Sequence, residues 1–358
     1  MTALLSSTTT PLHHYEGLNS MATDARPTIR DIAREAGVST AAVSFALNNR
    51  PGISDATREK ILRLARELGW TPSIAARALS SQRSRAVGLV IGRPSRSVAA
   101  ERFFFHFMTG IERKLSEERY SFVFHASATM DDELDTYRSW WAERRVDAVI
   151  VVDLLQDDPR PEFLRSLGIP AVFAGDDPGY GAALLSDEEA LMETVVAYAR
   201  EIGVDSIGYV AGPRTIVHSR RRLAAFETLT ASAGVRGIGT AAAEYSRVAG
   251  HEAVRELATA GMPRLIVFDN EVLCLGGSRE LARQGVAMPD EVALLSLEDS
   301  QLCEVMAPAV TAVRRDPAEF GERCAALITD LLRKRIEDGA RTIFDPAPEI
   351  IERASTAL

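Results

Sequence analysis

The sequence has little of what secreted, membrane and metal-binding proteins need. Its 358 residues include three cysteines, Cys274, Cys303 and Cys324, which are far apart and odd in number. We expect them to be small buried residues, since disulfide frameworks and cysteine metal sites use more cysteines at closer spacing. No apolar run approaches the length of a membrane span, and residues 1–26 lack the basic start and apolar stretch of a secretory signal.

Catalytic motifs are also missing. There is no G-x-S-x-G elbow, no P-loop and no dinucleotide fingerprint, and Gly88 and Gly92 in AVGLVIG do not form a phosphate loop. His251-Glu252 resembles the start of a zinc-protease motif, but Arg255 stands where the second histidine is needed. We therefore expect no catalytic residues, no metal, no cofactor and no enzymatic activity.

What is present fits a globular protein of several domains. The chain is long enough for two or three of them, with 46% hydrophobic and 25% charged residues. Residues 1–26 are polar and unpatterned, so we expect a disordered tail, within which Met21 is an alternative start. His13 and His14 in this tail are not expected to be ligands.

Residues 27–72 read as a helix-turn-helix domain. Thr28 and Asp31 have capping-box spacing, which predicts a helix opening near Thr28. Gly37 ends it, and Ser39 offers the cap of a second helix whose inner stripe includes Val43 and Ala46. Ser54 caps a third helix, with a core face of Ile61, Leu64, Ala65 and Leu68, that ends near Gly69. Any small three-helix bundle with a glycine turn has this pattern, so the helices alone do not settle a function.

The outward face of the second helix is small and largely uncharged. It carries Ser39, Thr40, Ala41, Ser44 and Phe45. Such a face can enter a major groove closely, where methyl groups pack on thymine and hydroxyls reach base edges or phosphates. Residues 73–86 then form a basic segment, which includes a potential short helix with too few large apolar residues to fold alone.

Three ordered motifs in this region closely resemble the LacI/GalR family of bacterial repressors. They are T-I-x-D-I-A-x-x-A-G-V-S-x-x-x-V-S-x-x-L-N from Thr28, S-x-x-T-R-E-K-I from Ser54 and P-x-x-x-A-x-x-L from Pro72. The resemblance implies a headpiece that reads half an operator and a hinge helix that orders in the minor groove when two subunits bind. Thr40, Ala41 and Phe45 would read bases, and Leu79 would wedge between base steps.

Many family members carry Arg where this chain has Phe45, so a bidentate guanine contact is not available there. Phe45 either touches a thymine methyl or packs inward, and the sequence leaves both open. The whole set predicted to contact DNA is Thr28, Ser39, Thr40, Ala41, Ala42, Ser44, Phe45, Asn48, Arg77 and Leu79.

Charge separates the two ends of the chain. Residues 26–86 hold 11 Arg and Lys against 5 Asp and Glu, whereas the whole chain has a net charge of −9. Only the N-terminal module attracts phosphate, so a second nucleic-acid site in the acidic body is not expected.

Residues 87–358 alternate short β-branched runs with amphipathic segments, which is the βαβ pattern of an α/β fold with doubly wound parallel sheets. Two such series predict two lobes, with a ligand between them at the carboxyl ends of the strands. This resembles the family's periplasmic-binding-protein-like effector and dimerisation domain. We expect an N-lobe of about 87–186 and 312–342 and a C-lobe of about 187–311 and 343–355.

The resemblance places five residues at the effector: Asp153, Arg222, Tyr245, Asn270 and Glu298. Arg222 would grip hydroxyls or a carboxylate, Asn270 would bond vicinal hydroxyls, and Tyr245 would stack on a pyranose. Helix capping is an equal alternative for Asp153 and Asp269, and ordinary packing is one for Tyr245. Asp269, Glu271, Ser296 and Glu298 depart from the common pattern, and some relatives bind nucleobases, so the effector class stays open.

We therefore expect a cytoplasmic, nucleoid-associated repressor that binds double-stranded DNA at a pseudo-palindromic operator under control of a sugar-like effector. The rival is a solute-binding protein of a transport system, which the body alone would allow but which would need a signal instead of a DNA module. Residues 350–358 show no leucine heptad, which favours a homodimer over a tetramer.

Overall fold

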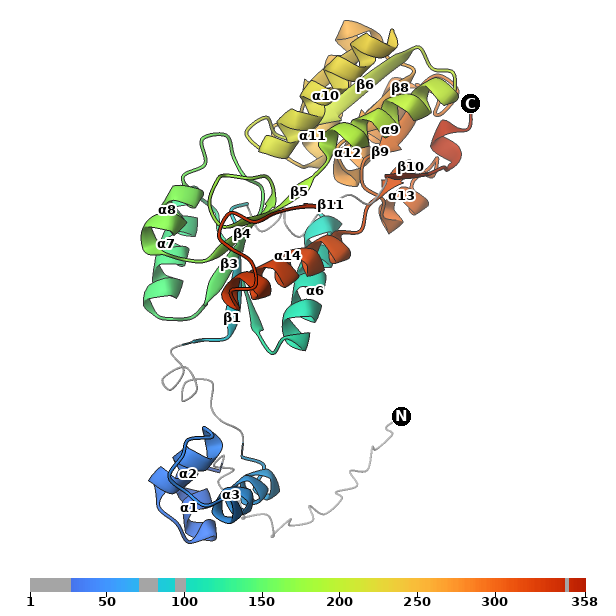
Figure 1. Cartoon of the computed structure of the whole chain (residues 1–358). Helices are drawn as coiled ribbons and strands as arrows, with labels where there is room; N and C mark the ends of the chain where they lie inside the picture. The colour runs from blue at the N-terminus through green and yellow to red at the C-terminus, as the bar shows by residue number, and fades with distance from the viewer. Residues whose placement is uncertain (1–26, 71–82, 94–100, 345–347) are drawn as a thin grey trace, which may run out of the picture. The chain divides into compact units, whose positions relative to one another are not determined.

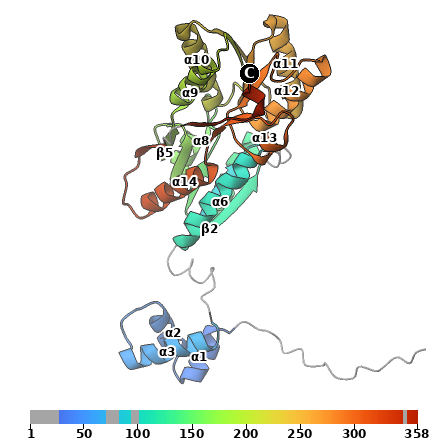
Figure 2. The ribbon, with the colours of Figure 1, turned by 90° about the vertical axis from the view of Figure 1, so that its right-hand side faces the viewer.

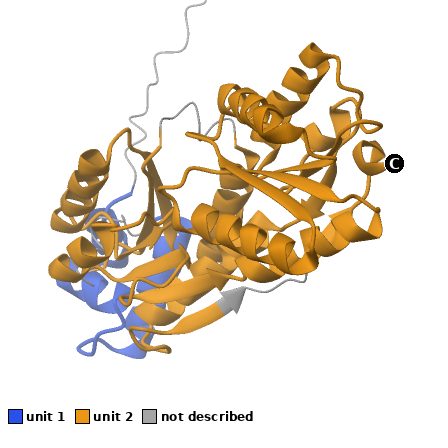
Figure 3. Cartoon of the chain, turned by 90° about the horizontal axis from the view of Figure 1, so that it is seen from above, with its two compact units in different colours: residues 1–77 blue, residues 78–358 orange. Residues whose placement is uncertain are grey.

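The computed structural model describes residues 27–70, 83–93, 101–344 and 348–358. The predicted tail and the predicted hinge contacts Arg77 and Leu79 lie outside the described residues. The chain divides into two compact units, residues 1–77 and 78–358, which Figure 3 colours separately.

The first unit is the predicted three-helix bundle. Its helices are α1 (Ile29–Ala36), α2 (Thr40–Leu47) and α3 (Asp55–Glu67). Its core holds the predicted inward residues, namely Ile32, Ala33, Ala36, Val43, Ala46, Ile61 and Ala65. Leu68 was expected in this core but is 37% exposed, because it follows the last turn of α3 as its C-cap.

The second unit contains the two predicted lobes, each built on a six-stranded sheet (Figure 1). The first sheet has the order β11-β5-β4-β3-β1-β2, and all its pairings are parallel. Its strands are β1 (Ala86–Ile91), β2 (Ser121–Ala126), β3 (Ala148–Val151), β4 (Ala171–Gly175), β5 (Ala182–Ser186) and β11 (Arg341–Phe344).

The second sheet repeats this order as β12-β10-β9-β8-β6-β7, with β12 antiparallel at its edge. Its strands are β6 (Ser206–Ala211), β7 (Arg236–Ala241), β8 (Leu265–Phe268), β9 (Ala293–Ser296), β10 (Thr311–Arg314) and β12 (Glu349–Ile351). The matching order of the two sheets is the doubly wound architecture that the sequence predicts.

Helices cover both faces of each sheet. In the first lobe α6 (Arg102–Glu117) and α14 (Pro317–Leu332) share one core, and α7 (Met130–Ala142) and α8 (Arg160–Leu167) the other. In the second lobe α9 (Glu188–Glu201) and α10 (Val217–Ala233) share one core. The other core of that lobe is shared by α11 (Arg247–Gly261) and α12 (Glu271–Gln284). The short α13 (Gln301–Val305) and a 3-10 turn (Ala354–Thr356) complete the described elements. Figure 2 shows α6 and α14 side by side.

The chain passes between the lobes three times: after Ser186, after Arg314, and between Phe344 and Glu349. The boundaries expected at 312 and 343 are each a few residues early. β10 belongs to the second sheet because it pairs with β9 and β12, and β11 belongs to the first because it pairs with β5.

Candidate functional site

Local hydrogen bonds define the ends of the headpiece helices. Thr28 and Asp31 form the predicted capping box, in which the Thr28 amide donates to Asp31 Oδ2 at 2.9 Å. Gly37 ends α1 with a φ of 67°, a left-handed conformation that glycine adopts without strain. The Ala42 amide donates to Ser39 Oγ at 3.1 Å, so α2 begins at the predicted cap. The turn between the two helices is therefore fixed by short-range chemistry.

The predicted reading face of α2 is accessible at its first turn. Ser39, Thr40, Ala41 and Asn48 are exposed, while Ala42, Ser44 and Phe45 are half-buried. Val43 and Ala46 fill the core behind them. Thr40 and Ala41 therefore present a hydroxyl and a methyl group at the end of the helix where a groove contact is expected.

Phe45 packs within the headpiece. A Cβ added to Gly52 would lie 3.2 Å from its ring, so the ring covers this glycine in the turn before α3. Arg58 holds the same turn, because its guanidinium donates to the carbonyl oxygens of Phe45 at 3.3 Å and Arg50 at 2.8 Å. Of the two roles left open for Phe45, packing is the one with observed contacts.

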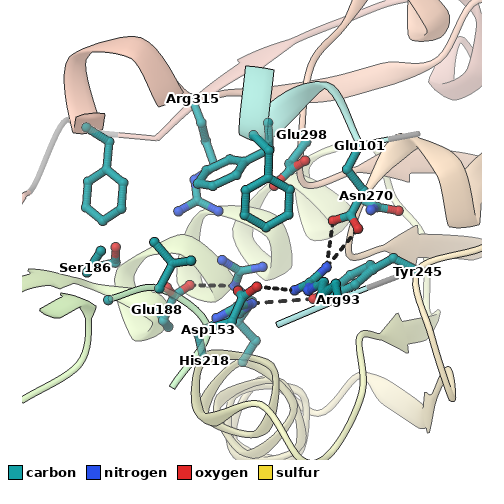
Figure 4. Close-up of a pocket in the computed structure, with 17 residues that line it drawn as sticks. Arg93, Glu101, Asp153, Ser186, Glu188, His218, Tyr245, Asn270, Glu298 and Arg315 are labelled. Atoms are coloured by element: carbon teal, nitrogen blue, oxygen red, sulfur yellow. Dashed lines mark hydrogen bonds and ion pairs between the residues drawn. The ribbon is translucent and has the colours of Figure 1, made fainter. Parts of the chain in front are cut away.

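The second candidate site is a cavity of about 60 Å³ between the lobes, shown in Figure 4. All five residues predicted at the effector line it, which are Asp153, Arg222, Tyr245, Asn270 and Glu298. Four of them lie after strands β3, β7, β8 and β9, as expected for a ligand site at the carboxyl ends of parallel strands, whereas Arg222 lies within α10.

Arg222 is already paired inside the protein. The residue is 4% exposed, and its Nε lies 2.5 Å from Glu188 Oε2 and its Nη1 2.9 Å from Asp269 Oδ1. Asp269 also accepts hydrogen bonds from Tyr209 at 2.7 Å and Tyr245 at 2.6 Å. Although burial opposes it, Arg222 holds the pKa of Asp269 below its ordinary value, so the pair stays charged. A ligand that binds the Arg222 guanidinium has to compete with the carboxylates of Glu188 and Asp269 for its N–H groups.

The helix-cap alternative is wrong for both aspartates. Asn270, not Asp269, caps α12, since its Oδ1 accepts from the Leu273 amide at 3.0 Å. Pro159 occupies the N-cap of α8, which follows Asp153. Asp153 has a φ of 52° and forms an ion pair with Arg93 at 2.7 Å. A left-handed backbone is uncommon for a residue with a side chain, and such residues concentrate at functional sites.

Arg93 and Glu101 are cavity residues that the sequence reasoning missed. Arg93 Nη1 contacts Glu101 Oε1 at 2.7 Å, and its guanidinium lies 5.2 Å from the Phe104 ring and 4.7 Å from the Tyr245 ring. It therefore covers one face of the Tyr245 ring. Arg93 follows β1 just as Asp153 follows β3, so the strand-end rule that found Asp153 could have found it.

Burial raises the pKa of Glu101 to about 8, although Arg93 opposes the shift. Burial, and then repulsion from Glu271, raises the pKa of Glu298 well above its ordinary value. Burial also raises the pKa of Glu271. The cavity thus holds carboxyl groups that can donate hydrogen bonds as well as accept them.

Arg315 is a further missed residue. It lies just after β10, is half-buried and lines the cavity, where Figure 4 shows its guanidinium pointing inward. No ion pair or hydrogen bond joins it to any other residue that the structure describes. Its charge acts to lower the pKa of Glu188 and Glu298, but no direct contact occupies its guanidinium as Glu188 and Asp269 occupy that of Arg222.

The lobes are joined across the mouth of the cleft by backbone hydrogen bonds. The Gln156 amide donates to the Thr215 carbonyl at 3.0 Å, and the Val217 amide to the Leu154 carbonyl at 2.9 Å. Arg221 of α10 also pairs with Asp176 of the first lobe at 2.5 Å. The two lobes therefore contact each other directly through Leu154, Gln156 and Asp176 of the first lobe.

Other motifs noted in the sequence have ordinary structural roles. The three cysteines are buried and unpaired, as predicted. His251 Nδ1 contacts Glu280 at 3.0 Å. Within the described ranges no group of three or more His, Cys, Asp or Glu could hold a metal ion. No helix in those ranges is long and apolar enough to cross a membrane.

Comparison with known proteins identifies both domains. Residues 28–73 match the family model for bacterial regulatory proteins of the lacI family, and residues 196–356 match the periplasmic binding protein-like domain. The HTH-type transcriptional regulator CelR of Thermobifida fusca is 29% identical over 89% of this chain and 96% of its own length.

Solved structures show the same relationship. The CelR–cellobiose complex has a TM-score of 0.70 at 26% identity and covers 92% of this chain and all of that one. A LacI family regulator from Bifidobacterium animalis has a TM-score of 0.69 at 30% identity, covering 77% of this chain and 98% of that one. These relatives are transcriptional regulators, not enzymes. The chain belongs to the LacI family of bacterial regulatory proteins and is a DNA-binding transcriptional regulator with a ligand-binding domain.

Proposed function

We propose that the protein is a homodimeric repressor whose affinity for a pseudo-palindromic operator is set by a sugar or sugar derivative bound between its lobes. One observation carries this proposal. A single chain has both a headpiece with an accessible α2 face and an interlobe cavity lined by charged and polar side chains. A solute-binding protein has no use for the headpiece, which disfavours that rival.

On the DNA side, Thr40 and Ala41 are the proposed base-reading residues. Thr28, Ser39, Ala42, Ser44 and Asn48 surround them as candidates for backbone contacts, with Phe45 supporting the turn. Leu79 and Arg77 remain the proposed minor-groove wedge and phosphate contact of the hinge. The basic N-terminal module supplies the attraction to phosphate in a cytoplasmic, nucleoid-bound protein.

Exposed apolar side chains support a dimer. Phe105 on α6 is 63% exposed and Phe124 on β2 is 40% exposed. In the second lobe Val248 on α11 and Val305 on α13 are 66% and 76% exposed. A second copy related by two-fold symmetry would cover such residues on both lobes and would place two headpieces on two half-sites.

A sugar suits the cavity better than a nucleobase. Arg93 occupies one face of the Tyr245 ring, so we expect hydrogen bonds, and not stacking on that face, to hold the ligand. The remaining lining offers many hydrogen-bonding groups, which match hydroxyls. CelR, a relative with the same two domains, was solved with cellobiose.

Gel-shift titrations with and without saccharides test the proposal. We expect one retarded complex on a fragment carrying the pseudo-palindrome, with a midpoint that an active saccharide shifts. Ala41→Glu should abolish the specific complex, because a carboxylate at the groove repels phosphate. Ala56→Glu on the exposed start of α3 is the matched control. Absence of any sequence-specific complex would contradict the proposal.

A further inference from the structure

The amino ends of β3, β1 and β2 lie side by side, because these three strands are neighbours in a parallel sheet. Arg83, Arg144 and Leu332 line one pocket, so the loops before β1 and β3 and the end of α14 meet at this edge of the first lobe. Exposed basic side chains gather there, namely Arg83, Arg85, Arg119, Arg144, Arg333 and Lys334. We call this surface the basic edge.

The acidic side chains of the basic edge do not cancel its charge. Both glutamates at the end of α6 form ion pairs, and Asp147 accepts hydrogen bonds from two backbone amides at 2.7 and 2.8 Å. Glu143 is followed by two arginines. The acidic residues before β11 lie beside β5 instead, because the adjacent Gly339 amide donates to the Gly181 carbonyl oxygen at 2.8 Å. The basic edge therefore keeps a positive charge, although the whole chain carries −9.

Four residues of the basic edge have a left-handed backbone. The φ angles of Arg85, Arg119, Arg144 and Lys334 are 52°, 60°, 53° and 55°. This conformation is uncommon for a residue with a side chain, and such residues concentrate at functional sites. Ending a helix does not require a basic residue there, since α9, α10 and α12 of the second lobe are each followed by a left-handed glycine.

The same four side chains are exposed, and none forms an ion pair or hydrogen bond with another residue in the described ranges. Their charges are therefore not used to hold the fold together. The loops that enter β6 and β9 of the second lobe carry exposed acids instead, namely Glu201, Asp205, Asp290 and Glu291. The positive surface is thus a property of the first lobe, and exposed cations of this kind bind DNA by releasing counterions from its phosphates.

The chain continues from the basic edge to the headpiece. Arg83 lies just before β1, and Trp70 is the last described residue of the headpiece. The segment between them can span at most roughly 45 Å when fully extended. A turn of B-DNA is about 34 Å long, so a duplex held by the headpiece extends far enough to meet the basic edge.

We propose that the basic edge is a second DNA-contacting surface, on which Arg85, Arg119, Arg144 and Lys334 bind backbone phosphates of the duplex that the headpiece holds. Such contacts position a protein on DNA and carry no base specificity. The acidic body was expected to hold no nucleic-acid site, because its summed charge hides this local basic surface. The inference adds a DNA contact to the effector-binding unit and does not depend on which effector is bound.

Fluorescence anisotropy of the full chain with a labelled random-sequence duplex of several helical turns tests this surface. The variant Arg119→Gly with Arg144→Gly removes two charges and places at both positions a residue that adopts their backbone conformation without strain. The slope of log affinity against log salt concentration should become shallower by about 0.9 for each lost phosphate contact, or about 1.8 per subunit. Affinity at low salt should fall by at least about ten-fold.

Two further variants separate phosphate contact from charge and folding. Arg200→Gln with Arg214→Gln removes the same charge from exposed, unpaired positions of the second lobe and should keep the wild-type slope. Arg119→Lys with Arg144→Lys should also keep it, because a point charge suffices for a phosphate. Thermal melting should show the glycine variant to be no less stable than the wild type.

Three results would overturn the inference. They are a wild-type slope and affinity in the glycine variant, an equal loss in the Arg200 and Arg214 control, and absence of any binding of the wild type to the random duplex. The first two leave operator recognition by the headpiece and its control by an effector untouched, since gel shifts on the operator fragment measure those separately.

Discussion

At the residue scale, Arg315 and Arg222 of the cavity are predicted to have different roles. Arg315→Gln should lower effector affinity by about ten-fold or more, since a hydrogen bond to a charged group contributes about 1.5–3 kcal/mol. It should leave the melting temperature near that of the wild type, because Arg315 pairs with no described residue.

Arg222→Gln provides the comparison. It removes the cation from buried Glu188 and Asp269 and should destabilise the fold by about 3–5 kcal/mol. Calorimetry and thermal melting of both variants measure the two effects. A stable Arg222→Gln, or an Arg315→Gln that melts early and binds normally, would contradict this assignment.

Glu101 predicts a pH dependence of stability. Its pKa is about 8 in the folded protein against an ordinary value of 4.5, so between pH 4.5 and 8 the folded chain keeps a proton that the unfolded chain has lost. Stability therefore falls as pH rises through this range, by at most about 1.4 kcal/mol per pH unit from this group.

Glu101→Gln removes that titration. Its unfolding free energy relative to the wild type should rise steadily between pH 4.5 and 8 and stay constant above. Denaturant unfolding at several pH values measures this difference in unfolding free energy. Loss of the Arg93 contact shifts the difference by a constant amount, so it does not change how the difference varies with pH. Parallel pH profiles for the two proteins would refute the assigned titration.

Single positions show where sequence reasoning works and where it stops. The caps Thr28, Ser39 and Ser54 were predictable because each bonds to a residue three positions along the chain. Asp153 could be placed at the cleft from its strand end, but its pairing with Arg93 could not. That pair joins residues 60 positions apart, so only the folded sheet brings them together.

At the element scale, glycines fix the closest helix contacts. In the first lobe a Cβ on Gly110 of α6 would lie 1.9 Å from the Ala318 carbonyl oxygen, and one on Gly321 of α14 would lie 2.2 Å from the Phe107 carbonyl oxygen. In the second lobe Gly250 and Gly276 make the same reciprocal contact between α11 and α12. Each lobe thus has one pair of helices in backbone contact.

Gly110→Ala should therefore destabilise the first lobe. The added methyl group meets backbone, which cannot rotate away, so we expect a loss of about 1–3 kcal/mol or more in unfolding free energy. Glu112→Ala, at an exposed position of the same helix, is the control and should change stability little. Thermal unfolding compares them, and equal melting temperatures would show that α6 and α14 can separate.

Elements with weak local patterns were missed. β7 has the sequence RGIGTA, whose glycines lower its strand propensity. Its pairing with β6 stabilises it as a strand in spite of that low propensity. α8 is only eight residues long and starts next to two prolines. Strongly patterned elements such as β1, α6, β3 and α9 fit the alternating pattern predicted for residues 87–358, because their apolar residues alone specify which face is buried.

At the scale of the whole molecule, backbone contacts join the two lobes of the second unit beside the cavity. Gln156 and Thr215 lie opposite each other beside the antiparallel bridge of Leu155 with Ile216, and one hydrogen bond joins their backbones across the lobes. Opposed residues in antiparallel pairs have Cα atoms about 4.5–5.5 Å apart, which is within the range of a disulfide. Both residues are exposed, and the native cysteines are buried.

A Gln156→Cys, Thr215→Cys double variant should thus lock the lobes closed when oxidised. If effector exchange and operator control require the lobes to separate, the oxidised protein releases a bound saccharide much more slowly. The protein concentration at the midpoint of its operator titration also no longer changes when saccharide is added. Reduction with dithiothreitol should restore both, since a ligand can only shift an equilibrium between states that remain accessible. Stopped-flow release and gel shifts on the same sample provide the test, with each single cysteine variant as control. An oxidised protein that exchanges saccharide and responds on DNA like the reduced one would show that control does not pass through closure of this cleft.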